Sequence, residues 1–172
     1  MRYGAIEAGG TKMVLAVADE QLNILCRMTI PTESPEKTVP AMISFFQENK
    51  VDALGIGSFG PLDLNPESPG YGSITKTPKL AWQDYPLMQV FQEELNIPCT
   101  IDTDVNAAAL CEAVMGNGKG LKNCVYVTVG TGIGGGVYCE GKLVHGLMHP
   151  EVGHMLLRAH SDDTCPDGFC PY

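Results

Sequence analysis

The residues most suited to chemistry begin with a glycine-rich segment, "VTVGTGIGGGVYC", which lies between two apolar runs. Five of the seven residues 130–136 are glycine. Glycine lets backbone amides approach a ligand closely and adopt positive φ, and a concave row of N–H groups binds anions. The segment therefore predicts an anion-binding loop, with an ordinary tight hairpin turn as the alternative.

The same segment matches the dinucleotide-binding pattern G-x-G-x-x-G, and Glu151 follows about 20 residues later. We reject this match, because the pattern requires a helix that opens at the loop and holds the pyrophosphate on its N-terminus. Here "GVYCEGKLV" continues as a strand. The sequence also lacks the P-loop pattern G-x-x-x-x-G-K-[ST].

A smaller glycine turn, "EAGGTK", spans Glu7 to Lys12. Gly9 and Gly10 would form the turn, and the Thr11 hydroxyl and the Lys12 amine would meet a phosphate. By itself this stretch is more typical of an ordinary hairpin than of a phosphate site. Two such loops, each between two strands, indicate a duplicated phosphate clamp in which two domains face each other across a cleft.

Carboxylates and histidines follow the predicted strands. Asp102 and Asp104, in "TIDTDVNAAALCEA", lie where a strand gives way to a helix. Asp104 is either a helix N-cap or a general base that accepts the proton of an acceptor hydroxyl, and both roles stay open. Glu151 and His154 in "HPEVGHM" form either a solvated loop or a polar pair that binds sugar hydroxyls.

The elements that position these residues follow from apolar periodicity. Strands are predicted within 2–19, 22–30, 51–58, 97–104, 123–130 and 135–146, the last with a turn at Glu140-Gly141. Helices are predicted within 34–50, with Pro40 near the first turn, within 85–96 and within 105–116, and residues 61–83 form a long loop. Strands followed by alternating helices and strands indicate an α/β or α+β fold.

Composition excludes several classes of protein. The 172 residues carry a net charge of −9, which argues against nucleic-acid and anionic membrane partners. No signal core or membrane-spanning run is present, so we expect a soluble, unexported protein. Seven cysteines make a disulfide framework improbable, and we expect buried free thiols at five of them: Cys26, Cys99, Cys111, Cys124 and Cys139.

Six motifs occur in this order: "EAGGTK", "GIGSFGPLD", "TPKLAW", "IDTDVNAAA", "VGTGIGGG" and "HPEVGH". Taken together, they resemble the ROK family of sugar kinases, and their sequences are most similar to those of bacterial fructokinases. The resemblance implies an actin-like ATPase (ribonuclease H-like) α/β fold. Residues 1–115 would form the N-terminal domain, and residues 116–172 the first part of the second domain.

The resemblance also implies residue roles for the transfer of phosphate from ATP, with Mg²⁺, to fructose. Asp104 would be the catalytic base and a sugar ligand. The implied phosphate-binding residues are Gly9, Gly10, Thr11, Lys12, Gly130, Thr131, Gly132, Gly134 and Gly135; the implied sugar-binding residues are Gly60, Glu151 and His154; and the implied Zn²⁺ ligands are His154 and Cys170. It further implies a cytoplasmic protein that forms a homodimer when full length.

Three positions depart from the broader family. Glu7 stands where many members have Asp, which would alter the coordination shell of the magnesium ion. Thr103 and Lys79 stand where many members have Asn, which argues against glucose as the acceptor sugar. Family members are also longer, so we expect a chain truncated within its zinc loop, with little kinase activity and with exposed apolar surface on its last strands. A complete zinc site from His154, His160, Cys165 and Cys170 is the alternative.

Other functions stay open. The acceptor could be mannose, glucose or an N-acetylhexosamine, because sugar pockets differ by few residues. A sugar-responsive repressor would need a DNA-binding segment before the first glycine loop, which starts at Glu7. A catalytically silent sugar-binding or regulatory protein is the third possibility.

Overall fold

The computed structural model describes residues 1–130, 132–146, 152–155, 160–162 and 164. Its larger sheet has five strands in the order β3-β2-β1-β4-β5. β1 pairs antiparallel with β2 and parallel with β4, and β5 adds to β4 in parallel. The strands are β1 (Tyr3–Ala8), β2 (Lys12–Ala18), β3 (Ile24–Pro31), β4 (Ala53–Ser58) and β5 (Cys99–Thr103), as the apolar patterns predicted.

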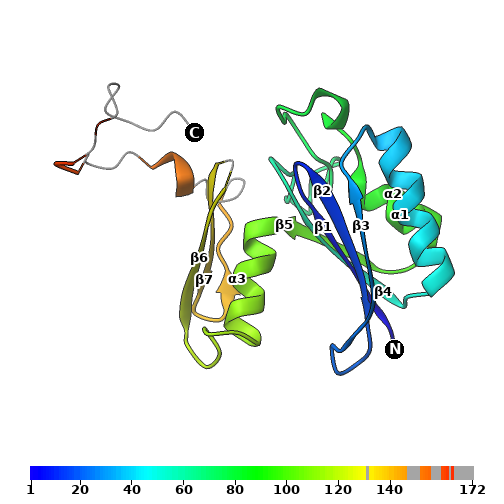
Figure 1. Cartoon of the computed structure of the whole chain (residues 1–172), viewed down its shortest axis with the longest axis horizontal. Coiled ribbons are helices and arrows are strands. Elements are labelled where there is room, and N and C mark those ends of the chain that lie inside the picture. Colours follow the sequence, from blue (N-terminus) through cyan, green and yellow to red (C-terminus); the bar gives the residue numbers. More distant parts are fainter. Residues whose placement is uncertain (131, 147–151, 156–159, 163, 165–172) are drawn as a thin grey trace.

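Helices α1 (Pro35–Asn49) and α2 (Leu87–Leu95) cover one face of this sheet (Figure 1). Ile6 and Ala8 of β1 are buried in the apolar core, whereas Glu7 between them is exposed. This alternation follows from the two-residue period of a strand. It directs the carboxylate of Glu7 to the face opposite the two helices.

The predicted place of Pro40 was wrong by one turn. Helix α1 starts at Pro35, directly after Ser34, and Pro40 lies inside it. A proline at the first helical position loses no hydrogen bond, so Pro35 sets the start and moves Pro40 into the second turn.

A smaller antiparallel sheet has the order β6-β7-β8, with β6 (Asn123–Val129), β7 (Ile133–Cys139) and β8 (Lys142–Leu143). The turn at Glu140 and Gly141 is confirmed, with φ of 48° and 85°. Positive φ at both central residues suits a two-residue hairpin turn. Two 3₁₀ turns, Leu80–Trp82 and Val152–His154, complete the described elements.

Helix α3 (Asp104–Val114) lies between the two sheets (Figure 1). A Cβ atom on Gly136 of β7 would overlap the carbonyl oxygen of Val105 and lie 2.9 Å from the Cβ of Ala109. On the other side, a Cβ on Gly57 of β4 would lie 3.0 Å from that of Ala107. The helix therefore packs against both sheets at distances that depend on glycine.

The expectation of five buried thiols was only partly correct. All five are free, but Cys111 and Cys139 are exposed and Cys26 and Cys124 are half-buried. Cys99 alone of these five is buried, and burial raises the pKa of its thiol to about 11. Apolar sequence neighbours did not decide exposure, because Cys111 lines an open cavity between α3 and the larger sheet rather than a packed core.

The outer side of β6 exposes valines, as expected for the last strands. Val125, Val127 and Val129 are 59%, 54% and 78% exposed.

No helix within the described residues has both the length and the apolar composition that crossing a membrane requires.

The packing of α3 predicts opposite effects for two strand glycines. Gly136→Ala should lower the free energy of unfolding by about 3 kcal/mol, because its methyl group meets backbone that cannot move aside. Gly55→Ala is the matched control, because no atom lies within 4 Å of a Cβ at Gly55. This control should raise stability by about 0.5–1 kcal/mol. Urea unfolding monitored by circular dichroism measures both, and equal effects of the two substitutions would contradict the packing described.

Candidate functional site

Helix α3 begins where β5 ends, and Thr103 is its N-cap. The Oγ1 of Thr103 accepts a hydrogen bond from the backbone N–H of Asn106 at 3.2 Å. Asp104 is the first residue of the helix, and its Oδ1 accepts from the backbone N–H of Val105 at 2.9 Å. The N-cap role considered for Asp104 was therefore wrong, because Thr103 has the extended backbone that an N-cap adopts.

Glu7 and Asp104 line one cavity, of about 810 Å³, between the larger sheet and α3. Glu7 comes from the carboxyl end of β1, next to the first glycine turn, and Asp104 from the start of α3. The remaining lining is largely small or apolar, including Ala5, Gly57 and Ala107. Asp102 lines the same cavity, and carboxylates in such surroundings can hold a hydrated cation or accept a proton.

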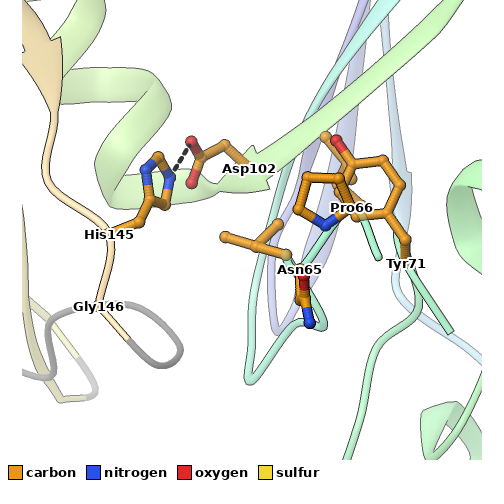
Figure 2. A pocket seen from close by; sticks show the side chains of 8 residues that line it. Asn65, Pro66, Tyr71, Asp102, His145 and Gly146 are labelled. Carbon is orange, nitrogen blue, oxygen red and sulfur yellow. Dashed lines mark hydrogen bonds and ion pairs between the residues drawn. The ribbon is translucent and has the colours of Figure 1, made fainter. Parts of the chain in front are cut away.

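Both oxygens of the neighbouring Asp102 are engaged. Its Oδ1 accepts from the backbone N–H of Thr103 at 2.7 Å and from Nδ2 of Asn106 at 2.8 Å. Its Oδ2 lies 2.8 Å from Nε2 of His145 (Figure 2). No role was expected for His145, and residue spacing held no signal of this contact, because 43 residues separate the pair.

A second cavity, of about 570 Å³, opens beside this pair. In Figure 2, His145 and Asp102 lie on one side, and Asn65, Pro66 and Tyr71 of the long loop lie on the other. The loop is anchored by Trp82, whose Nε1–H donates to the carbonyl oxygen of Glu33 at 2.8 Å. A buried tryptophan thus fixes a loop that lacks periodicity.

The first glycine turn is held in place by the end of β3. Thr32 donates its hydroxyl to the carbonyl oxygen of Gly9 at 2.7 Å and its N–H to that of Thr11 at 3.0 Å. Gly10, Thr11 and Lys12 are exposed and therefore open to a ligand. Across the turn, the Cε of Lys79 lies 3.4 Å from the place of a Cβ on Gly10, so the long loop brings a second amine beside the turn.

The second glycine segment divides into a turn and a strand. Gly130 and Gly132 are exposed, and the N–H of Gly130 donates to the carbonyl oxygen of Gly132 at 2.9 Å. Gly134 and Gly135 belong to β7. A Cβ atom added to Gly134 would lie 3.0 Å from a side-chain carbon of Val105, and one added to Gly135 would lie 3.0 Å from a side-chain carbon of Val152. Thr131 lies outside the described residues. A phosphate-binding role for this segment stays a prediction.

Most of the predicted sugar and zinc ligands cannot be placed. Glu151, Cys170 and the side chain of His154 lie outside what the structure describes. Gly60 precedes Pro61 in the long loop through a cis peptide bond. Among the described residues, no group of three or more histidine, cysteine or acidic side chains gathers in a way that could hold a metal ion.

Comparison with known proteins assigns the family. Residues 3–172 match the ROK family. The chain belongs to the ROK family. A relative from Bacillus subtilis is 50% identical over 169 residues, which are 98% of this chain and 56% of the relative. The fructokinase of Lactococcus lactis is 47% identical over 99% of this chain and 58% of its own length. This ROK chain thus spans less than two thirds of each relative's length.

A solved structure supports the fold. The ROK glucokinase of Streptomyces griseus, in complex with glucose and AMPPNP, superimposes with a TM-score of 0.77 at 29% identity. The match covers 90% of this chain and 50% of that one. The expected actin-like ATPase fold is thereby confirmed for this ROK chain.

The capping of α3 predicts a matched pair of Thr103 variants. Thr103→Val keeps the shape of the buried side chain but removes the hydroxyl, and should lower the free energy of unfolding by about 1 kcal/mol. Thr103→Ser keeps the cap and should retain most of that stability. Thermal unfolding of the two variants measures the difference, and a valine variant as stable as the serine variant would rule out the cap.

Proposed function

We propose that the protein containing this chain is a ROK-type sugar kinase that transfers the γ-phosphoryl group of ATP to a hexose, with fructose as the first candidate. The observation that carries the proposal is the shared cavity of Glu7 and Asp104, next to an exposed glycine turn. Fructokinases among the relatives, such as that of Lactococcus lactis, favour fructose as the acceptor.

In the proposed mechanism, Asp104 accepts the proton of the acceptor hydroxyl as that oxygen bonds to the γ-phosphorus, while the bond from the γ-phosphorus to the bridging oxygen breaks and ADP leaves. Phosphoryl transfer otherwise needs positioning and charge stabilisation rather than covalent help from the protein. The first glycine turn, with Thr11 and Lys12, would hold phosphate oxygens, and the turn at Gly130 and Gly132 would do so from the other sheet. Glu7 would bind a water of the Mg²⁺ that accompanies ATP, because Mg²⁺ keeps several waters and takes carboxylate ligands.

The remaining roles rest on family resemblance. Gly60, Glu151 and His154 would bind the sugar, and His154 and Cys170 would contribute to a Zn²⁺ site. A domain boundary near residue 115, a cytoplasmic location and a homodimer belong to the same proposal. The five-stranded sheet, which ends at Thr103, and the three-stranded sheet, which starts at Asn123, are compatible with that boundary.

The activity is tested on the product of the complete open reading frame that contains this sequence. ADP release should be measured with fructose, mannose, glucose and an N-acetylhexosamine. We expect the highest kcat/KM with fructose. A higher value with another hexose would reassign the acceptor, and no ADP release with any sugar would refute the kinase proposal.

The role of Asp104 predicts a separation of binding and catalysis. Asp104→Asn keeps the size of the side chain but removes the base, so kcat should fall by about 10²- to 10⁴-fold. The Kd for the sugar, measured by calorimetry, should stay within about threefold, because an amide still makes hydrogen bonds to hydroxyls. Glu112→Gln, at the other end of α3, is the control and should leave kcat unchanged. Wild-type turnover by Asp104→Asn would remove Asp104 from the mechanism.

A further inference from the structure

The hydrogen bond between His145 and Asp102 connects the two sheets of the molecule. Asp102 belongs to β5, at the edge of the five-stranded sheet, and His145 follows β8 in the three-stranded sheet. An ionised carboxylate only accepts hydrogen bonds, so Nε2 of His145 carries the proton and donates to Oδ2 at 2.8 Å. The imidazole therefore has a defined orientation relative to the end of β5.

The backbone next to His145 is fixed to the smaller sheet. The N–H of Val144 donates to the carbonyl oxygen of Val137 at 2.8 Å, and Tyr138 pairs with Leu143 across the hairpin. His145 is thus the residue after a strand hydrogen bond, not part of a loose connection. Its hydrogen bond to Asp102 therefore links the end of β5 to a segment that is hydrogen-bonded to β7.

On the other side, Asp102 controls the first turn of α3. Its Oδ1 holds the N–H of Thr103, the residue before Asp104, and the side chain of Asn106. Asn106 is fully buried, and its Oδ1 has no hydrogen-bond partner within the described structure. The Nδ2 atom of Asn106 lies 2.8 Å from Oδ1 of Asp102 and 3.4 Å from Nε2 of His145, so both residues bear on the orientation of this amide. A shift of Asp102 would therefore move its hydrogen-bond partners both before Asp104, at Thr103, and after it, at Asn106.

We propose that His145 is a positioning residue for Asp104. By donating Nε2–H to Asp102, it holds the Asp102 carboxylate and, through Thr103 and Asn106, the backbone that carries Asp104. His145 does not need to touch the substrate. The inference rests on the proposed kinase activity. It adds His145, which follows the smaller sheet, to the residues that position Asp104 at the start of α3.

The role of the Nε2–H group predicts a matched pair of variants in the complete protein. His145→Leu removes the donor, and kcat should fall about 10- to 100-fold, because a displacement of about 1 Å can cost 10²-fold. The KM for the sugar should change by less than about threefold, the pattern of an interaction that matters mainly in the transition state. His145→Gln places an amide N–H where Nε2–H lies and should restore kcat to within about threefold of wild type.

Two controls separate positioning from folding. Lys142 is exposed on the same hairpin, so Lys142→Leu should leave kcat and KM unchanged. In the Asp102→Ala background, His145→Leu should cause a smaller loss of kcat than in the wild type, because the two residues share a hydrogen bond and position the same turn. Additive losses, full activity of His145→Leu, or a glutamine variant as impaired as the leucine variant would each overturn the proposal.

A readout independent of turnover keeps this inference separate from the proposed function. In NMR spectra, the backbone amide resonances of Thr103, Val105 and Asn106 should shift in His145→Leu and remain near their wild-type positions in His145→Gln and Lys142→Leu. If the wild type phosphorylates no sugar, the kinase proposal fails and these resonances still decide whether His145 positions the turn. Unshifted resonances in His145→Leu would refute the inference even in an active enzyme.

Discussion

The close packing of α3 between two sheets is the constraint on which the candidate site depends. Gly136 on β7 and Gly57 on β4 allow the helix to approach both sheets, and a side chain at Gly136 would collide with the backbone at Val105. That contact lies one residue from Asp104 and sets the distance between the sheets at the start of the helix. The position of the carboxylate is therefore fixed by packing before any ligand is present.

Hydrogen bonds further restrict the backbone around Asp104, which the packing of α3 has placed. Thr103 caps the helix, and Asp102 uses both of its oxygens to hold Thr103, Asn106 and His145. Asp102 is half-buried and Asn106 is buried, and polar groups in such places are costly to leave unpaired, so a network in which each carboxylate oxygen is engaged favours one geometry. Catalysis by positioning needs such a geometry, since little covalent chemistry remains for a kinase to perform.

Glycine serves two purposes in the second glycine segment, and this explains why the sequence alone was ambiguous. Gly130 and Gly132 form an exposed turn suited to a ligand. Gly134 and Gly136 make room for α3, and Gly135 makes room for Val152. The absence of a Cβ permits both close packing and ligand approach, so the run of five glycines in the sequence does not reveal where one purpose ends and the other begins.

The sequence by itself determined the strands, the helices and the turn at Glu140 and Gly141, because apolar period and turn chemistry are local properties. Its motifs also indicated the family and the carboxylate at the end of β5. Tertiary structure decided that Thr103 rather than Asp104 caps α3, since capping depends on backbone angles at the strand–helix junction. It decided the exposure of Cys111, which depends on what covers a helix face. It alone brought His145 to Asp102, because a contact across 43 residues depends on how two sheets pack around one helix.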